Sequence, residues 1–412
     1  MSISEPLRLP CGATLPNRLA KGAMTEGLAT PDGVPTQALQ TLYRRWSQGG
    51  AGMHLTGNVI IDRDHLERPG NVVIDRAPDA EMKAALAAWA KAGTEAGNHL
   101  WMQISHAGRQ TQALVNKTPK APSAVKLGLP GGQFGEPVPL TGEEIEDLIG
   151  RFVTAATAAK EAGFTGVQIH AAHGYLISQF LSPRANQRTD QWGGSLENRM
   201  RFVLEAFKEI RKQTGEGFIV GVKLNSADFQ KGGFSEDESI AVVKALDALG
   251  VDFIEISGGT YEAPAMTGVK QSTRQREAYF LEFAEKVRGE VKTALMVTGG
   301  FRTRSGMDAA LQSGACDLIG IARPLAVETD APNNLVAGQD VKYAVKPIKT
   351  GIKPFDNMGV MEIIWYAAQF KTIGAGKTPD PNLSPLKVFA NYLKGNVKAM
   401  FKGKKTFGRL RA

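Results

Sequence analysis

Short apolar runs alternate with longer amphipathic stretches along most of this chain. Eight such runs occur, and several of them are apolar on both faces, which is typical of parallel strands covered by helices. They occupy residues 18–25, 52–58, 99–106, 164–170, 218–225, 251–259, 293–300 and 316–323. Two of the amphipathic stretches open with a capping-box pattern, Thr141 with Glu144 and Ser235 with Glu238. The pattern therefore predicts eight strand–helix units.

Eight such units predict an α/β fold, the (β/α)₈ TIM barrel. A doubly wound open sheet is the alternative, but it usually carries a Gly-rich dinucleotide loop, and the sequence has no G-x-G-x-x-G. We assign residues 1–330 to the barrel and residues 331–412 to a C-terminal helical, basic extension. The Pro- and Gly-rich residues 117–140 indicate a long loop, which a barrel would place over its active-site mouth.

Composition narrows the class of protein. Hydrophobic residues make up 42% of the 412 residues and charged residues 22%, as in ordinary globular proteins. Two cysteines, Cys11 and Cys316, exclude a disulfide framework and any four-cysteine metal site. The sequence shows no apolar run of membrane-spanning length and no secretory signal, so we expect a cytoplasmic protein.

The net charge of +8 is concentrated in the extension. Residues 341–412 carry 14 Lys and Arg against 3 Asp and Glu, which leaves 35 against 38 for the rest of the chain. The nearly neutral body and the lack of a recognition motif argue against nucleic-acid binding. Residues 361–370 predict an apolar helix docked on the barrel. The helical spacing of Val388, Tyr392 and Val397 indicates that part of the chain beyond Lys377 packs on the body as a helix with a solvated basic face. We expect catalysis not to need this segment; weak contact with an anionic membrane or an acidic partner is the alternative.

Catalytic groups of a (β/α)₈ barrel lie at the C-terminal ends of its strands. The predicted strands end with Thr25, Gly57, Gln103, His170 and His173, Lys223, residues 257–259, Gly299 and Gly300, and Ala322 and Arg323. Barrels commonly bind phosphate at the turns after the last two strands. Glycines there let backbone N–H groups approach an anion, and Arg323 can clamp it.

His170, His173 and Tyr175 form the second candidate group. The histidines can be zinc ligands, although no third ligand accompanies them. They can also be structural, or act as a neutral pair of donors that holds a substrate oxygen, which is the interpretation we favour. Tyr175 is either an ordinary packed tyrosine or a proton donor, because a phenol with a pKa near 10 can protonate a carbanion-like centre.

Lys223 ends the fifth predicted strand after the apolar run FIVGV. A buried lysine there can balance an anion such as a reduced flavin, or form a Schiff base as in some barrel aldolases; we favour the first. The strand ends carry no run of paired Asp and Glu, which argues against glycoside hydrolysis.

Residues 169–205, IHAAHGYLISQFLSPRANQRTDQWGGSLENRMRFVLE, resemble the signature of the old yellow enzyme (NADH:flavin oxidoreductase) family. The likeness extends from residue 15 to residue 325. It implies an FMN-containing (β/α)₈ barrel in which NAD(P)H reduces FMN, and the flavin then passes a hydride to an activated alkene such as an enone.

The resemblance also implies a role for each matching residue. Tyr175 is the expected proton donor, and His170 and His173 are expected to bind the carbonyl or nitro oxygen of the substrate. The expected FMN contacts are Ala23, Met24, Thr25, Gly57, Gln103, Lys223, Gly299, Gly300, Phe301, Ala322 and Arg323. No metal site is expected.

Two positions depart from the family pattern. Lys223 stands where Arg is common, which keeps the charge but loses the planar fork. Gly27 stands where some relatives place a tyrosine that lines the pocket, which suggests a roomier site. We expect an FMN-dependent ene-reductase that uses NAD(P)H, with a dehydrogenase or demethylase on another substrate, or a non-catalytic flavin-binding protein, as alternatives. The sequence specifies neither the physiological substrate nor the choice of NADH or NADPH, and an oligomer stays open.

Overall fold

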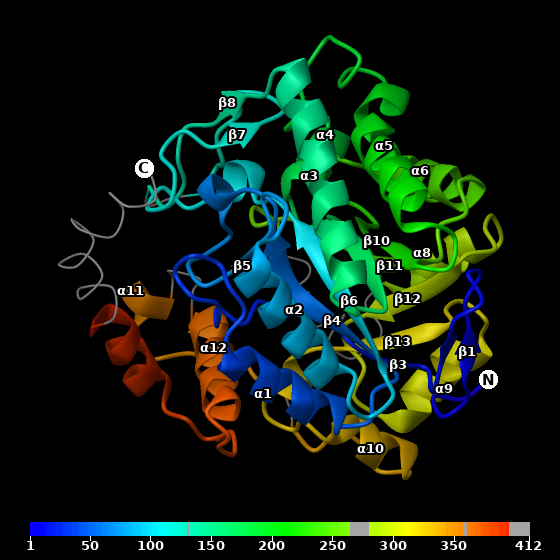
Figure 1. The fold of residues 1–412 in the computed structure, drawn as a ribbon, viewed down its shortest axis with the longest axis vertical. Coiled ribbons are helices and arrows are strands. Elements are labelled where there is room, and N and C mark those ends of the chain that lie inside the picture. Colours follow the sequence, from blue (N-terminus) through cyan, green and yellow to red (C-terminus); the bar gives the residue numbers. More distant parts are fainter. Residues whose placement is uncertain (130–131, 264–279, 344, 357–360, 395–412) are drawn as a thin grey trace.

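The computed structural model describes residues 1–129, 132–263, 280–343, 345–356 and 361–394. Its centre is a closed barrel of parallel strands, one for each predicted run (Figure 1). The strands are β3 (Leu19–Lys21), β4 (Met53–Ile60), β6 (His99–Ser105), β9 (Gly166–Ala171), β10 (Ile219–Asn225), β11 (Phe253–Ser257), β12 (Ala294–Thr298) and β13 (Leu318–Ile321). β13 pairs with β3, and β3 pairs with β4, so the sheet closes on itself. The predicted TIM barrel is confirmed.

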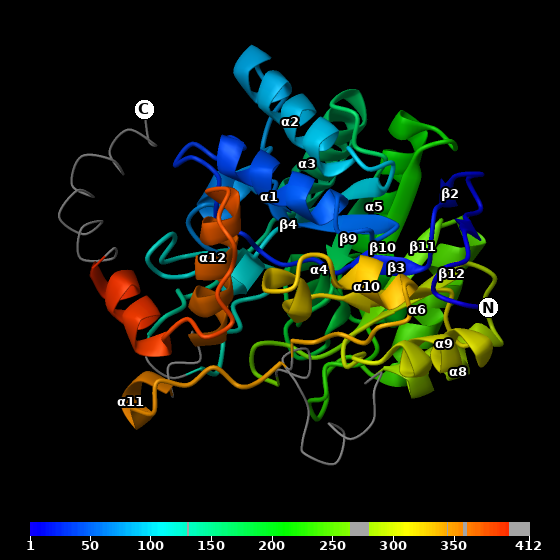
Figure 2. The same cartoon turned by 90° about the horizontal axis from the view of Figure 1, so that it is seen from below.

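Helices surround the barrel and alternate with its strands (Figures 1 and 2). They are α1 (Gln37–Ser47), α2 (Ala80–Gly93), α3 (Gly142–Glu161), α4 (Leu176–Leu181), α5 (Leu196–Thr214), α6 (Glu236–Ala248), α8 (Leu281–Arg288), α9 (Arg304–Gln312), α10 (Ala331–Val336), α11 (Lys353–Asp356) and α12 (Met361–Gly374). Both predicted capping boxes are present, at the start of α3 and of α6. Each box satisfies backbone N–H groups that the first helical turn leaves without partners.

A short hairpin closes the N-terminal end of the barrel. β1 (Leu7–Arg8) and β2 (Thr14–Leu15) pair antiparallel. Leu7 and Leu15 belong to one buried cluster with Trp101 and Phe253, whose rings lie 4.7 Å apart in edge contact. This apolar plug leaves the C-terminal ends of the strands as the accessible end of the barrel.

The long loop predicted over the mouth contains two very short strands, β7 (Lys120–Ala121) and β8 (Val138–Pro139). The backbone N–H of Gly128 donates to Oε1 of Glu262 at 2.9 Å, and the ring of Phe134 lies 6.2 Å from that of Tyr261. Both partners follow β11, and Tyr261 lines the cavity described below. The loop therefore reaches the C-terminal end of the barrel, as predicted.

The predicted helix over residues 361–370 is present as α12, which lies beside α1 in both views (Figures 1 and 2). Trp365 and Phe370 are each 1% exposed, and the ring of Phe370 lies 5.5 Å from that of Trp46 in α1. Side chains on both sides of residue 330 share one hydrophobic core, so this part of the extension packs as the barrel helices do.

The chain beyond Lys377 packs on the body with one face of a helix. The indole N–H of Trp365 donates to the carbonyl of Leu383 at 2.8 Å, and Val388 and Phe389 are buried. The expected packing of a partly solvated helix is therefore present in residues 385–394. Residues 395–412, which hold the end of the basic tail, lie outside the described residues.

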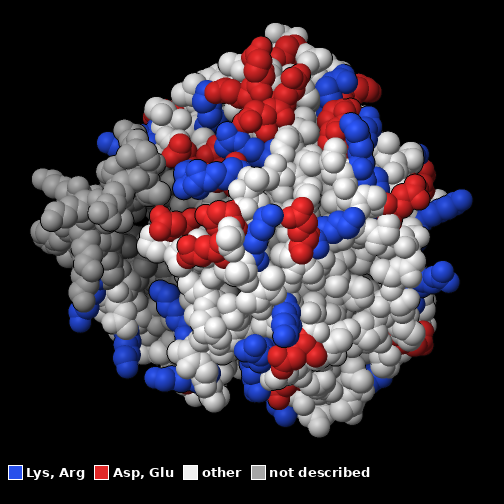
Figure 3. All heavy atoms as spheres, viewed as in Figure 1, with Lys and Arg blue, Asp and Glu red and all other residues white. Residues whose placement is uncertain are grey.

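The distribution of charged side chains on the surface agrees with the nearly neutral charge of residues 1–340. On the face in Figure 3, acidic and basic side chains are interspersed, and acidic ones gather where α3 begins. Within the described ranges, no helix combines the length and apolarity that crossing a membrane requires.

A matched pair of substitutions tests the packing of the segment that follows α12. Phe389 is 3% exposed and Leu386 is 48% exposed, three residues apart in helical residues 385–394. Phe389→Ala should lower the free energy of unfolding by about 3 kcal/mol, because it empties a buried site. Leu386→Ala should change it by less than about 0.5 kcal/mol. Urea denaturation measures both, and equal small losses would show that this segment does not stabilise the fold.

Candidate active site

The C-terminal ends of the barrel strands surround a cavity of about 370 Å³. Its lining brings together residues that are far apart in the sequence but stand at the ends of neighbouring strands. From the predicted set it includes Ala23, Met24, Thr25, Gln103, His170, His173, Tyr175, Lys223, Gly299, Gly300, Phe301, Ala322 and Arg323. Gly57 is the predicted site residue that the lining lacks.

Gly57 lies behind the lining, and the close contacts at this position explain why it is absent from the cavity wall. A Cβ atom there would approach Oε2 of Glu26 to 2.4 Å and the carbonyl of Met24 to 2.6 Å. The Gly57 N–H donates to Oε1 of Glu26 at 2.9 Å. Glycine therefore lets β4 pass closely behind the segment that carries Met24. Gly27 is also outside the lining and packs against Gly70, and the expectation of a roomier pocket at this position stays a prediction.

A chain of hydrogen bonds runs along one wall of the cavity. The Nε2 of Gln103 donates to Oδ1 of Asn58 at 2.8 Å, and the Nδ2 of Asn58 donates to Oε2 of Glu67 at 3.1 Å. The hydroxyl of Thr25 donates to the same Glu67 oxygen at 2.6 Å. Burial raises the pKa of Glu67, but the charge of Arg68 and these hydrogen bonds outweigh it, so the pKa is below its usual value. Glu67 is thus a buried carboxylate, and our sequence analysis missed it and Arg68.

Gln103 stands at the end of this series of hydrogen bonds, and one of its side-chain atoms has no partner there. Its Oε1 is buried and has no hydrogen-bond partner within the described structure. A buried amide oxygen normally accepts a hydrogen bond, because leaving it unpaired costs about 1–3 kcal/mol. An N–H group of a bound heterocycle would supply that partner, so this wall fits the edge of a flavin ring.

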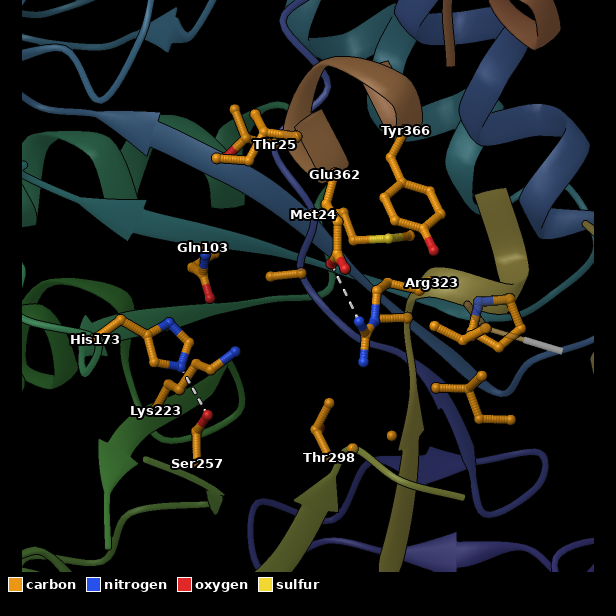
Figure 4. A pocket seen from close by; sticks show the side chains of 18 of the residues that line it. Met24, Thr25, Gln103, His173, Lys223, Ser257, Thr298, Arg323, Glu362 and Tyr366 are labelled. Atoms are coloured by element: carbon orange, nitrogen blue, oxygen red, sulfur yellow. Dashed lines mark hydrogen bonds and ion pairs between the residues drawn. The ribbon is translucent and has the colours of Figure 1, made fainter. Parts of the chain in front are cut away.

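His170 and His173 lie together in the cavity with ring centroids 5.1 Å apart. The Nε2 of His173 lies 2.7 Å from Oγ of Ser257 (Figure 4), and its backbone N–H donates to Oδ1 of Asn225 at 3.1 Å. Burial, followed by the charge of Lys223, lowers the pKa of both imidazoles well below its usual value. Both rings are therefore neutral near pH 7. The Nδ1 of His170 accepts the N–H of Ala172 at 3.3 Å, which puts the ring proton on Nε2.

Tyr175 has a second phenol as its partner. Its hydroxyl lies 2.8 Å from the hydroxyl of Tyr261, and its ring lies 4.8 Å from that of His170. Burial and the negative charge of Glu67 raise the pKa of Tyr175 well above its usual value. The phenol stays protonated and can give its proton only to a strongly basic centre. Our sequence analysis missed Tyr261, because only the fold brings the turn after β11 to that after β9.

Lys223 is buried, and its Nζ lies 3.1 Å from Oε1 of Glu255. These two residues are register partners on β10 and β11. The other carboxylate oxygen of Glu255 accepts from Nε2 of Gln168 at 2.8 Å, which satisfies the carboxylate further. A paired ammonium fits a fixed cation better than the nucleophilic amine that a Schiff base requires. Glu255, which interrupts the apolar run FIEIS, is a partner that our sequence analysis overlooked.

The turns after β12 and β13 form the opposite end of the cavity. Gly299 and Gly300 have φ values of +113° and +92°, which a residue with a side chain would rarely adopt. Arg323 begins a short 3₁₀ helix, Arg323–Ala326. Its Nη1 lies 3.2 Å from Oε2 of Glu362 (Figure 4). The two predicted phosphate-binding turns thus share one wall, where an acidic side chain already contacts the arginine.

The extension supplies part of this wall. Glu362, Ile363, Tyr366 and Phe370 of α12 line the cavity. The sequence-based boundary at residue 330 left them out of the candidate site. The only available signal was the amphipathic helix itself, because nothing in the sequence shows which end of the barrel it covers.

One further polar cluster lies outside the cavity. Asp62, His65 and His106 place potential metal ligands within 4.8 Å of one another. The second nitrogen of each ring accepts a backbone N–H, from Lys120 for His65 and from Gly108 for His106. Each neutral ring therefore carries its proton on the nitrogen that faces Asp62 and has no lone pair for a metal there. This geometry fits a hydrogen-bonded carboxylate better than a metal centre.

The fold is a (β/α)₈ barrel, and the C-terminal ends of its strands surround a polar cavity whose residues could hold an anionic heterocycle. The model of the NADH:flavin oxidoreductase / NADH oxidase family matches residues 2–340. The chain is 37% identical over 362 residues to the NADH-dependent flavin oxidoreductase iliE of Hypocrea jecorina, covering 82% of this chain and 90% of that protein.

Two solved structures show the same similarity. A 2-naphthoyl-CoA reductase complex superposes with a TM-score of 0.76 at 26% identity, over 82% of this chain and 52% of that one. An old yellow enzyme homologue from Zymomonas mobilis gives a TM-score of 0.70 at 26% identity, over 84% and 95%. The chain therefore belongs to the NADH:flavin oxidoreductase (old yellow enzyme) family, as an NAD(P)H-dependent flavin oxidoreductase.

The pairing of Lys223 with Glu255 can be tested without any ligand. Glu255→Gln should lower the free energy of unfolding by about 3 kcal/mol, because it leaves a buried ammonium without its counter-charge. Adding Lys223→Met to that variant should recover part of the loss, since no unpaired charge then remains. Urea denaturation of the wild type, both single variants and the double variant gives the coupling. Strictly additive losses would show that the two side chains do not interact.

Proposed function

We propose that this protein is an FMN-dependent ene-reductase. Its substrates would be α,β-unsaturated carbonyl or nitro compounds, reduced at the activated C=C bond with electrons from NAD(P)H. The observation that carries this proposal is the neutral pair His170 and His173 beside the protonated Tyr175, in one cavity with the fixed cation Lys223.

The residues of the cavity suit FMN at both ends. The unpartnered Oε1 of Gln103 can accept an N–H of the ring, and Lys223 provides positive charge nearby. The glycine turn at Gly299 and the arginine at Arg323 can hold a phosphate. When bound, FMN takes two electrons from the nicotinamide donor and supplies a hydride to the acceptor.

The remaining chemistry belongs to the protein. Neutral imidazoles can donate hydrogen bonds to the acceptor oxygen, which withdraws electrons from the conjugated C=C bond. Charge then develops at the α-carbon, a basic centre that a phenol with a raised pKa can protonate. The second phenol, Tyr261, lies within hydrogen-bond distance of Tyr175 and can hold its hydroxyl in place.

Two half-reactions test the proposed function directly. The protein purified with FMN should lose its flavin absorbance when NADH or NADPH is added without oxygen, and an enone should restore it. Protein that binds no flavin would refute the cofactor assignment. Flavin that is reduced but reoxidised by no enone or nitroalkene would instead favour a dehydrogenase or demethylase.

Tyr175→Phe separates protonation from hydride transfer. Reoxidation by an enone should slow by about 10²–10⁴-fold, the usual contribution of a general acid. Reoxidation by a quinone should stay within a few-fold, because a quinone oxygen collects protons from solvent. Stopped-flow absorbance measures both rates. Equal slowing with both oxidants would show that Tyr175 supports the cavity and does not supply the proton.

The neutral histidine pair predicts a flat pH profile for substrate binding. The pKa values of His170 and His173 lie well below the usual 6.5, so both rings stay neutral between about pH 8 and pH 6.5. The KM for a neutral enone should therefore stay constant over that range. A KM that changes with an apparent pKa near 6.5 would contradict a neutral pair.

A further inference from the structure

The α12 helix places a carboxylate inside the expected phosphate site. Glu362 lies in the first turn of α12, beyond the residues that the family model matches. Its Oε2 is 3.2 Å from Nη1 of Arg323, and both side chains line the cavity (Figure 4). The side chains are 31% and 28% exposed, so an anion that enters from the cavity can reach this pair.

We propose that Glu362 is an internal competitor for the flavin phosphate, which makes it a determinant of cofactor affinity and selectivity. This inference rests on the proposed function, since it concerns the phosphate of FMN. Arg323 contacts the Glu362 carboxylate before FMN binds, and it must turn toward the phosphate when FMN binds. Glu362 thus weakens the binding of FMN but leaves the phosphate-free riboflavin unaffected.

The packing of α12 fixes the position of Glu362. Trp365 and Phe370, on the next turns of the same helix, are 1% exposed and lie in the barrel core. The backbone of Glu362 therefore cannot withdraw from the cavity without breaking that core. Only its side chain can rotate, so a phosphate held by Arg323 keeps a carboxylate as a near neighbour. A phosphate monoester carries a charge of about −1.5 to −2 at pH 7, and like charges at this range repel.

The start of α12 also stabilises the Glu362 carboxylate when Arg323 no longer contacts it. Negative side chains in the first turn of a helix are stabilised by the N–H groups and the dipole of that end. Glu362 therefore keeps a favourable environment when Arg323 turns away. The exchange of partners requires no buried unpaired charge, because both side chains are partly exposed.

The test compares two flavins that differ only in the phosphate. Flavin-depleted protein is titrated with FMN and with riboflavin, and the quenching of flavin fluorescence gives the Kd. Glu362→Gln should bind FMN about 5- to 10-fold more tightly than wild type and bind riboflavin within about twofold of it. The control is Glu146→Gln, which makes the same change in net charge on the exposed surface of α3. It should leave both Kd values unchanged.

Salt gives a second measurement of the same interaction. The difference in FMN affinity between wild type and Glu362→Gln should shrink as NaCl is raised from 0.05 to 1 M, because the screening length falls to about 3 Å. Glu362→Asp, which keeps the charge but shortens the side chain by one methylene, should bind FMN with an intermediate Kd. This variant keeps the proposal testable if Glu362→Gln is unstable.

Three results would overturn the proposal. Equal tightening for FMN and riboflavin would show that residue 362 only shapes the wall. Weaker FMN binding in Glu362→Gln would show that Glu362 orients Arg323 toward the phosphate. Unchanged FMN binding would show that the carboxylate does not sense the phosphate. Wild-type protein that binds neither flavin would instead refute the proposed function, so the two failures are distinguishable.

Discussion

Closure of the barrel is the constraint on which the rest of the structure depends. Strands β13 and β4 both pair with β3, a strand of three residues, so a short segment completes the ring. Because all eight strands are parallel, their C-terminal ends must meet around one space. Residues such as Thr25 and Arg323, almost 300 positions apart, therefore line one cavity. No local interaction could bring them together, and an open sheet would have left the outermost of them far apart.

The interior of the ring is divided into an apolar and a charged layer. Leu15, Trp101 and Phe253 fill the N-terminal end, where the hairpin covers them. Above them, Lys223 pairs with Glu255 at 3.1 Å. Lys21, at the end of β3, faces α1: its Nζ donates to the carbonyl of Leu55 at 2.7 Å and lies 4.4 Å from the ring of Trp46. Burial lowers the pKa of Lys21 to about 8, even though nearby carboxylates favour its charged form. Buried charges of this kind are costly, and Lys223, which lines the cavity, stands where a redox reaction would need a cation.

The sequence predicted the strands well because each is a run of apolar residues, and the barrel makes every such run buried on both faces. All but one of the site residues that it predicted line the cavity, because residues at strand ends need only the barrel topology to be placed. Gly57 shows the limit of this reasoning. Glycine occurs there to let β4 pass Met24 closely, and a strand-end position alone does not distinguish a close approach from a ligand contact.

The partners of the site residues could not be placed in the same way. Pairs such as Tyr175 with Tyr261 and Lys223 with Glu255 depend on strand register and turn geometry, which the hydrophobic pattern does not specify. Glu255 did leave a signal, since a carboxylate inside an apolar run must have a buried counter-charge. Glu362 left none.

The attachment of α12 explains how a barrel of this family can gain a cavity residue, Glu362, from a segment that the family model does not match. The helix contacts α1 through Phe370, whose ring lies 5.5 Å from that of Trp46, and Trp365 lies in the same hydrophobic core. Its first turn extends to the turns that follow β12 and β13, where Glu362 meets Arg323. Hydrophobic docking thus fixes where the helix lies, and a single polar residue on it changes the chemistry of the site. An extension of this kind can alter how a cofactor is held while the strands, the turns and the histidine pair stay as they are.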